Sequence, residues 1–313
     1  MKSFLGHSQN LNAKTLVLRA VSSAGRAVSF LFAVLPARVR LFIGDVIGVL
    51  WFDVFRIRRK VALENLKIAF PEKSEHDRIV IARNSLRSLG RCLTEFFLFP
   101  FFKRSDVPKY FTIHGLENLE AARAKDRGVL VLGLHLGNGD FGIAALSRLG
   151  YEISLISKNF KTKWLNDLWF GMRAQHGTQF IAPEKSSFQI LRALKGKRTI
   201  FFVLDQYMGP PVGCRTMFFG KETGTAMGLA LIAQRSESPV VTAYTFREAD
   251  GRHVIVIGPE IPWQSSVTSL GQVARDEENI TTMTQVYTDK LEEIVRRFPD
   301  QWMWIHRRWK NFG

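Results

Sequence analysis

Apolar and polar positions alternate through the middle of the chain in a pattern that predicts short buried strands between amphipathic helices. The predicted strands are Val129 to Leu134, Glu152 to Ser157, Gln179 to Ala182 and Thr199 to Leu204. Helical periodicity falls between them, near residues 141–149, 162–176 and 186–195. This order is typical of parallel strands that are joined by right-handed crossovers and covered by helices.

The pattern changes after the fourth strand and completes the predicted fold. Two apolar runs, 240–246 and 253–257, are joined across a short turn and predict an antiparallel hairpin. A long amphipathic helix is predicted from Asp276 to Phe298. The fold class is therefore α/β, with a mixed, mostly parallel sheet that is flanked by helices. Before the first strand, residues 56–102 have helical periodicity that Pro71 interrupts.

The first sixty residues combine apolar runs with an excess of positive charge. Residues 27–37 and 41–55 are apolar runs broken by charged side chains, and neither provides the ~20 apolar residues that a membrane span needs. Residues 1–60 also carry ten lysines and arginines against two aspartates, which gives +8 of the chain's net charge of +16. Such an excess attracts anionic lipid, phosphorylated substrates or nucleic acid.

We interpret residues 11–56 as a membrane-associating helical segment, because basic side chains interleaved with Phe, Trp and Leu suit a helix that lies among lipid headgroups. The alternative is an ordinary amphipathic subdomain packed on the core. The predicted organisation is a basic, apolar helical segment over residues 1–60 and an α/β domain over residues 61–313. A nucleic-acid partner is not expected, since helix-turn-helix, RRM-like and zinc patterns are absent from the sequence.

Neither a metal nor an organic cofactor is expected. The seven histidines show no HExxH or paired-ligand spacing. The glycines Gly220, Gly224 and Gly228 fit no Walker or dinucleotide fingerprint. The two cysteines, Cys92 and Cys214, offer neither a disulfide framework nor metal-ligand spacing, and they fit a reducing, cytosol-facing location.

The strongest chemical signal lies where a predicted strand ends at His135 and a predicted helix begins near Asp140. On a single helix this spacing of five residues would set the two side chains roughly 140° apart. Gly137 and Gly139 let the backbone turn sharply, so we expect Asp140 to reach back to the His135 ring. A histidine with an ordinary pKa near ~6.5 suits general-base catalysis, and the carboxylate would fix its tautomer.

The attacking hydroxyl in such a reaction is expected to belong to the substrate. The sequence contains no GxSxG, and Ser147 lies inside a predicted helix. The competing interpretation is structural: His135 ends a strand, and Asp140 stabilises the helix N-terminus. Asp205 is a further candidate because it directly follows a buried strand, where an acid must either pair or act in chemistry. Ligands of open α/β sheets bind at the carboxyl ends of strands, where His135 and Asp205 are both expected.

Three tryptophans near the C-terminus, Trp302, Trp304 and Trp309, are interleaved with cationic side chains. They form either a second surface that binds lipid or phosphate, or part of the core with the cations in solvent. The sequence leaves this choice open.

Several sequence blocks occur together and in a fixed order. They are NLKIAFP (65–71), HLGNGD (135–140), DQ (205–206), MFFGKETGTAMGLALIA (217–233) and PDQWMWIHRRWK (299–310). Over roughly residues 15–312, the chain resembles the late acyltransferases of lipid A biosynthesis, which are related to the glycerolipid acyltransferases with an HxxxxD motif. The terminal block and the FFG segment are the specific part of this resemblance.

The resemblance implies an activity, a location and a set of site residues. It implies transfer of a fatty acyl chain from acyl carrier protein to a hydroxyl of a phosphorylated glycolipid, a lipid A precursor, at the cytoplasmic face of the inner membrane. It implies that His135 is the base with Asp140 as its partner, and it maps family positions onto Arg173 and Asp205. Asn138 and Gln206, in the same blocks, are further candidates for substrate binding or transition-state support.

One departure concerns the family block HxGNWE, where this chain has Gly139 and Asp140 in place of Trp and Glu. The missing aromatic ring and the shorter acid predict a changed pocket floor. A different lipid or a glycoside as acceptor is therefore the first alternative. A non-catalytic basic protein that binds membranes or nucleic acid is the second.

Overall fold

A mixed sheet forms the centre of the computed structural model, which describes residues 25–158, 162–183, 186–264 and 276–312. The strand order is β1-β9-β8-β2-β5-β3-β4. These strands are β1 (Phe111–His114), β2 (Val129–Gly133), β3 (Ile153–Ile156), β4 (Gln179–Ile181), β5 (Thr199–Val203), β8 (Val240–Arg247) and β9 (His253–Glu260). All neighbouring pairs are parallel except β8 and β9. The predicted α/β class with a mostly parallel sheet is confirmed.

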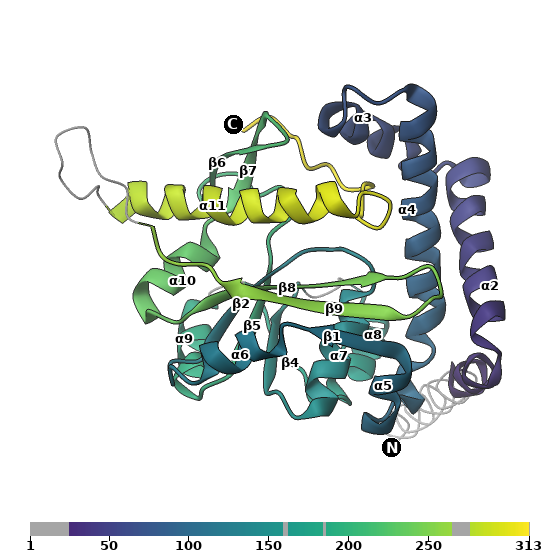
Figure 1. The fold of residues 1–313 in the computed structure, drawn as a ribbon, viewed down its shortest axis with the longest axis horizontal. Coiled ribbons are helices and arrows are strands. Elements are labelled where there is room, and N and C mark those ends of the chain that lie inside the picture. Colours follow the sequence, from purple (N-terminus) through teal and green to yellow (C-terminus); the bar gives the residue numbers. More distant parts are fainter. Residues whose placement is uncertain (1–24, 159–161, 184–185, 265–275, 313) are drawn as a thin grey trace, which may run out of the picture.

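Helices cover both faces of the sheet because its central strands bury side chains on both sides. Leu130 and Leu132 of β2 pack into one apolar cluster, and Val129 and Val131 pack into another. The first cluster contains residues of α9 (Ser187–Lys195), α10 (Gly228–Ser236) and α11 (Asp276–Arg297), and the second contains residues of α6 (Leu116–Arg123) and α7 (Gly139–Leu149). Figure 1 shows α11 on one side of the sheet and α6 and α7 on the other.

The remaining elements lie mostly before β2 or beside the sheet. They are α2 (Ala37–Val49), a π-helix η1 (Leu50–Phe55), α3 (Arg59–Ala69), α4 (Glu75–Phe96), two short 3-10 helices (Phe99–Phe101 and Arg104–Asp106), α5 (Val107–Tyr110), α8 (Lys163–Ala174) and an antiparallel hairpin of β6 (Gly213–Phe218) and β7 (Lys221–Ala226). As predicted, the helical stretch before the sheet is interrupted at Pro71, and α4 starts anew from Ser74, whose hydroxyl accepts a hydrogen bond from the Asp77 amide.

β1 and the β6–β7 hairpin were not predicted from the sequence. β1 is only four residues long, which is too short for its period-2 pattern to be distinctive. β7 reads KETGTA and shows little of the apolar alternation that predicts a strand. Its threonines Thr223 and Thr225 are nonetheless fully buried, because both side chains make hydrogen bonds with Arg308 near the C-terminus.

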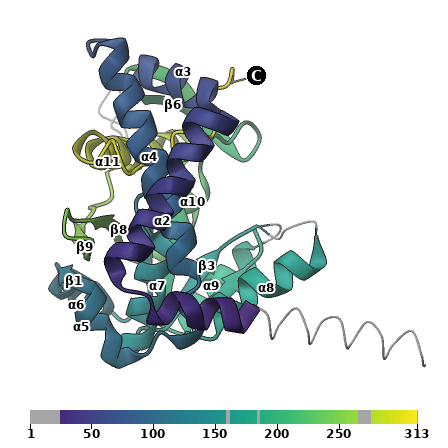
Figure 2. The same ribbon diagram turned by 90° about the vertical axis from the view of Figure 1, so that its right-hand side faces the viewer.

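Helix α2 lies alongside α4, and Figure 2 shows the two crossing closely. Glycines permit this approach: a Cβ on Gly90 of α4 would lie 2.1 Å from the Gly44 carbonyl oxygen of α2. Asp45 of α2 pairs with Arg87 and Arg91 of α4 at N–O distances of 2.8 and 2.6 Å. Within the described ranges, no helix is both long enough and apolar enough to cross a bilayer. Residues 11–24 of the predicted membrane segment lie outside those ranges.

Candidate active site

His135 and Asp205 meet because the strands that precede them are neighbours in the sheet. β2 and β5 are parallel, and their register pairs Gly133 with Val203, two residues before each site residue. The His135 ring nitrogen Nδ1 lies 2.8 Å from Oδ1 of Asp205, and the His135 backbone N–H donates to Oδ2 at 2.9 Å. The carboxyl ends of two adjacent strands therefore build a histidine–aspartate pair.

Asp205 is fully buried and accepts a third hydrogen bond, from the indole Nε1 of Trp302, at 2.7 Å. Burial alone would raise the pKa of Asp205, but the charge and hydrogen bonds of His135 and the charge of His306 outweigh it, so the pKa lies well below its usual range. The carboxylate is therefore ionised and can only accept hydrogen bonds. Consequently Nδ1 of His135 carries the proton that faces Asp205.

The other ring nitrogen of His135, Nε2, is available to contact a substrate. The side chain is 41% exposed and lines a large cavity that is described below. No residue in the described parts of the chain hydrogen-bonds to Nε2. Burial would lower the pKa of His135, but the charge and hydrogen bond of Asp205 overcome this, so the pKa is raised above its usual value. The imidazole is thus a strengthened base with a fixed tautomer.

The structure corrects the predicted partner of His135. We expected Asp140 to turn back to the ring, but the ring pairs with Asp205, and Asp140 accepts a hydrogen bond from Arg173 instead. The physical reason is that β2 and β5 are neighbours, so Asp205 already lies at Nδ1 of the ring, while Arg173 lies within reach of Asp140. Its carboxylate is directed to α8, where Arg173 lies with only 9% of its side chain exposed.

Asn138 and Gln206 occupy different environments in the site. Asn138 is buried, and its side-chain oxygen caps α7 by accepting from the Phe141 amide at 3.1 Å. Gln206 is exposed and lines the cavity, while its backbone carbonyl accepts from Arg308 at 3.2 Å. Both residues line the same cavity, and Asn138 in addition holds the start of the helix.

The terminal tryptophan block belongs mainly to the core. Trp302 and Trp304 are fully buried, and Trp309 is partly buried. Of the neighbouring cations, Arg308 is also fully buried, with hydrogen bonds to the Gly224 carbonyl at 2.6 Å and the Thr225 hydroxyl at 2.7 Å. The block supports the site from behind, since Trp302 holds Asp205. No sequence pattern predicts that contact, because the two residues are 97 positions apart.

One large cavity joins these groups. Its volume is about 1020 Å³, at the upper end for small-molecule sites, and its walls are mostly apolar. His135, Asp140, Arg173 and Gln206 line it together, while Asp205 lies behind the histidine. Gly139 also lines it, and a Cβ there would find its nearest neighbour, a backbone oxygen, 4.0 Å away. The cavity suits a long apolar group with a reactive end at His135.

Comparisons with known proteins place the chain among lipid acyltransferase sequences. The profile of a family described as bacterial lipid A biosynthesis acyltransferase matches residues 9–311. The chain is 28% identical to the lipid A biosynthesis palmitoleoyltransferase of Escherichia coli (strain K12) over 291 residues, which is 92% of this chain and 90% of the relative. It is 25% identical to the lipid A biosynthesis lauroyltransferase of the same organism over 298 residues, with the same coverage. It is 22% identical over 233 residues to a phosphatidylinositol mannoside acyltransferase of Mycobacterium tuberculosis (strain ATCC 25618 / H37Rv), covering 72% of this chain and 69% of the relative.

Proposed function

Because this chain belongs to the bacterial lipid A biosynthesis acyltransferase family, we propose that its cavity moves a fatty acyl chain from acyl carrier protein to a hydroxyl of a phosphorylated lipid A precursor, with His135 as general base. Membership makes the chain an acyltransferase of late lipid A acylation and sets aside a non-catalytic role. The observation that carries the mechanism is the His135 ring, oriented by Asp205 and open to a mostly apolar cavity.

The proposed reaction proceeds by direct attack. Nε2 of His135 removes the proton of the acceptor hydroxyl as its oxygen attacks the thioester carbonyl carbon. The tetrahedral intermediate then breaks its carbon–sulfur bond, and the imidazolium returns the proton to the departing thiolate. The products are an ester on the glycolipid and the free thiol of the carrier. Asp205, ionised throughout, stabilises the imidazolium and holds its Nδ1–H.

Arg173 is placed to stabilise the oxyanion or to bind a phosphate of the acceptor. Its guanidinium lines the cavity, and Asp140 holds one edge of it. A cation that is fixed before the reaction stabilises developing negative charge without reorganisation. The N-terminus of α7 opens on the same cavity through Gly139 and Asp140, and its partial positive charge acts in the same direction.

A different lipid or a glycoside remains the second candidate for the acceptor. The observation that favours it is the open space at Gly139, where the family block has a tryptophan. One relative is named for phosphatidylinositol mannoside, so related sequences are named for acceptors other than lipid A. The chemistry at His135 would be unchanged, because only the pocket floor differs.

We further propose that α2 and η1 lie on the cytoplasmic face of the inner membrane. The charges that interrupt their apolar runs face inward: Asp45 pairs with arginines of α4, and Asp53 pairs with Arg83 at 2.8 Å. The opposite side exposes large apolar side chains, including Phe42 at 67% and Phe55 at 66%. An apolar face flanked by basic residues is typical of a helix that lies in the headgroup region.

The decisive experiment is an assay with defined acyl carrier protein thioesters and a lipid A precursor, followed by mass spectrometry of the lipid product. The wild-type chain should acylate the precursor, and His135→Ala should lose ~10²- to 10⁴-fold in rate while the fold is retained. Full activity of His135→Ala would refute the mechanism. Acylation of a different lipid in an extract, with the precursor untouched, would favour the second acceptor.

A further inference from the structure

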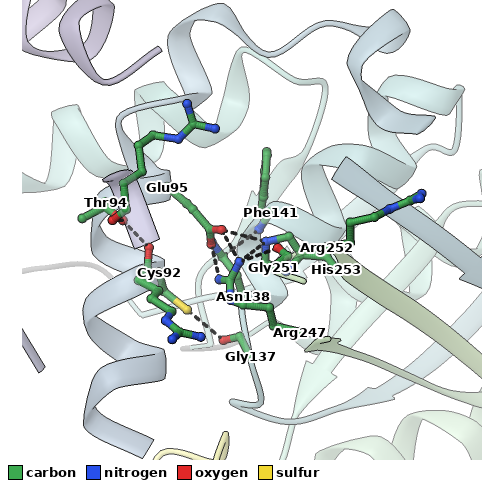
Figure 3. A network of polar contacts seen from close by, with 12 residues as sticks. Cys92, Thr94, Glu95, Gly137, Asn138, Phe141, Arg247, Gly251, Arg252 and His253 are labelled. Carbon is green, nitrogen blue, oxygen red and sulfur yellow. Dashed lines mark hydrogen bonds and ion pairs between the residues drawn. The ribbon is translucent and has the colours of Figure 1, made fainter. Parts of the chain in front are cut away.

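A buried polar cluster lies next to the cavity and is not used by the mechanism above. It consists of Glu95 at the end of α4, Arg247 at the end of β8, His253 at the start of β9 and Asn138 before α7 (Figure 3). The side chains of Glu95, Arg247 and His253 are 8%, 2% and 1% exposed. Four segments that are distant in sequence thus meet at a single carboxylate.

Both oxygens of the Glu95 carboxylate are fully engaged. Oε1 accepts from Arg247 Nη1 and from His253 Nε2, the latter at 2.9 Å. Oε2 accepts from Arg247 Nη2 at 2.6 Å and from Asn138 Nδ2 at 2.9 Å. A buried ion pair of this kind adds little net stability compared with apolar residues. Its four hydrogen bonds do, however, leave the carboxylate a single orientation.

The Glu95 carboxylate determines which way the Asn138 amide faces. An ionised carboxylate can only accept hydrogen bonds, so the NH₂ group of Asn138 must point toward it. The amide oxygen then points the other way and accepts from the Phe141 N–H, which caps α7. Without a carboxylate at this position, the amide could rotate by 180° and present its NH₂ group to a helix N–H that needs an acceptor.

The same face of α4 also contacts Gly137, the residue before Asn138. Cys92, one turn earlier on the helix, donates through Sγ to the Gly137 carbonyl at 3.3 Å, and the Gly137 N–H donates to the Gln301 carbonyl at 3.1 Å. Gly137 has a φ of 51°, and a Cβ would lie 2.4 Å from the Thr245 carbonyl oxygen, so this corner packs closely against β8 and has no space for a side chain. The corner separates His135 from Asp140.

We propose that Glu95 is a positioning residue for acyl transfer: through Asn138 it fixes the first turn of α7, and thereby the Asp140–Arg173 pair, relative to His135. This inference rests on the proposed function for its catalytic consequence, but its structural part is independent of any substrate. Glu95 touches none of the reacting groups. It acts on the helix through Asn138.

The structural part is tested by hydrogen exchange of the backbone amides in Glu95→Gln. A glutamine can offer its own NH₂ group to Asn138, so we expect the cap to be lost and exchange at residues 139–142 to rise by at least about tenfold. Glu95→Gln/Arg247→Met removes both charges together and guards against unfolding caused by an unpaired arginine. If exchange in this turn is unchanged in both variants, the proposal is wrong, whatever the activity.

The matched control is Arg148→Met, which removes a contact at the other end of the same helix. Arg148 Nε donates to His176 Nδ1 at 2.9 Å, far from the cap. We expect Arg148→Met to leave both the exchange of residues 139–142 and the turnover number close to wild type. Equal effects in this control would mean that any loosening of α7 has the same result, and Glu95 would lose its special role.

The catalytic part is tested by a double-mutant cycle with Arg173→Lys. If Glu95 acts by placing Arg173, Glu95→Gln should lower kcat at least about tenfold in the wild-type background but less than about threefold when Arg173 is already lysine. A merely structural loss would multiply in both backgrounds and would overturn the proposal. Failure of the proposed function would look different, because wild-type protein would then acylate nothing or His135→Ala would be fully active.

Discussion

Replacing Asp205 by asparagine should abolish general-base catalysis by His135 while leaving the fold intact. Two N–H groups, the His135 backbone amide and the Trp302 indole, donate to Oδ2 of Asp205. Neither group makes another hydrogen bond within the described residues, so both need an acceptor at the Oδ2 position. The amide oxygen of an asparagine must therefore take the Oδ2 position. Its NH₂ group then faces Nδ1 of His135, which lies 2.8 Å from Oδ1 in the wild-type protein. An NH₂ group donates, so Nδ1 has to accept and the ring proton moves to Nε2.

A histidine that is protonated at Nε2 cannot take a proton from the acceptor hydroxyl, so the loss should approach that of the base itself. In serine proteases the corresponding change, which also leaves the wrong tautomer, lowers kcat by ~10⁴, or about 5 kcal/mol of transition-state stabilisation. The folded state loses one charge-assisted hydrogen bond, which contributes about 1.5–3 kcal/mol. We therefore expect a kcat reduced by ~10³- to 10⁴-fold and a melting temperature lowered by only several degrees.

The pH dependence separates Asp205 from Asp140. The pKa of His135 is raised, and the base must be neutral, so wild-type activity should fall as the pH drops through a value above ~6.5. In Asp205→Asn the largest cause of that increase is gone, and burial lowers the pKa, so the acidic limb of residual activity should move to lower pH. Asp140→Asn is the matched control and should move the limb less, because the charge of Asp140 is a smaller cause.

The result that would refute this reasoning is specific. If Asp140→Asn moved the acidic limb further than Asp205→Asn, the acid five residues after the histidine would be its true partner in solution. If Asp205→Asn retained more than about a tenth of the wild-type kcat, the tautomer would not be under the control of this carboxylate. Circular dichroism and melting curves should accompany both variants, so that a loss of folded protein is not read as a loss of base.

Two further outcomes follow from the site and from the outer face of α2. Arg173→Lys keeps the positive charge beside Asp140 but loses the planar, two-pronged guanidinium. We therefore expect kcat to fall by ~10²-fold, with no shift of the acidic limb of the pH–activity profile. An unchanged kcat would show that Arg173 does not stabilise the transition state. Phe42→Ser/Phe55→Ser should weaken binding to vesicles of anionic phospholipid at least ~10-fold in flotation assays, since each buried Phe contributes about 1.5–3 kcal/mol. Phe188→Ser, at the exposed phenylalanine of α9, is the control, and equal weakening there would contradict a surface centred on α2.

The fold was largely predictable because its central strands are buried on both faces. Such strands appear in the sequence as continuous apolar runs, and the predicted run from 129 to 134 differs from β2 by one residue. The end of α7 was equally clear, since Gly150 adopts a φ of 106°, which favours glycine. Local signals of this kind depend only on neighbouring residues, and the sequence displays them directly.

The arrangement of the site was only partly predictable, because it depends on strand order. His135, Asp140, Arg173 and Asp205 were all candidates from the sequence, but which acid meets the histidine depends on β2 lying next to β5. The order of strands in the sheet cannot be read from the apolar pattern of each strand. For the same reason the role of Trp302 was missed, since its indole reaches an acid 97 positions earlier in the chain.

The separate partners of the two acids change what the HxxxxD spacing means in this protein. The His135 ring takes its orientation from Asp205 and the sheet, whereas Asp140 holds Arg173 from the first turn of a helix. The five-residue spacing therefore sets two separately held pairs on either side of one corner. We therefore expect a shorter acid at position 140 to shift Arg173 and to leave the His135 ring in place. The replacement of the family's Trp and Glu by Gly139 and Asp140 should thus change which acceptor fits and how the charge on that acceptor is stabilised. The proposed proton transfer at His135 should be unaffected.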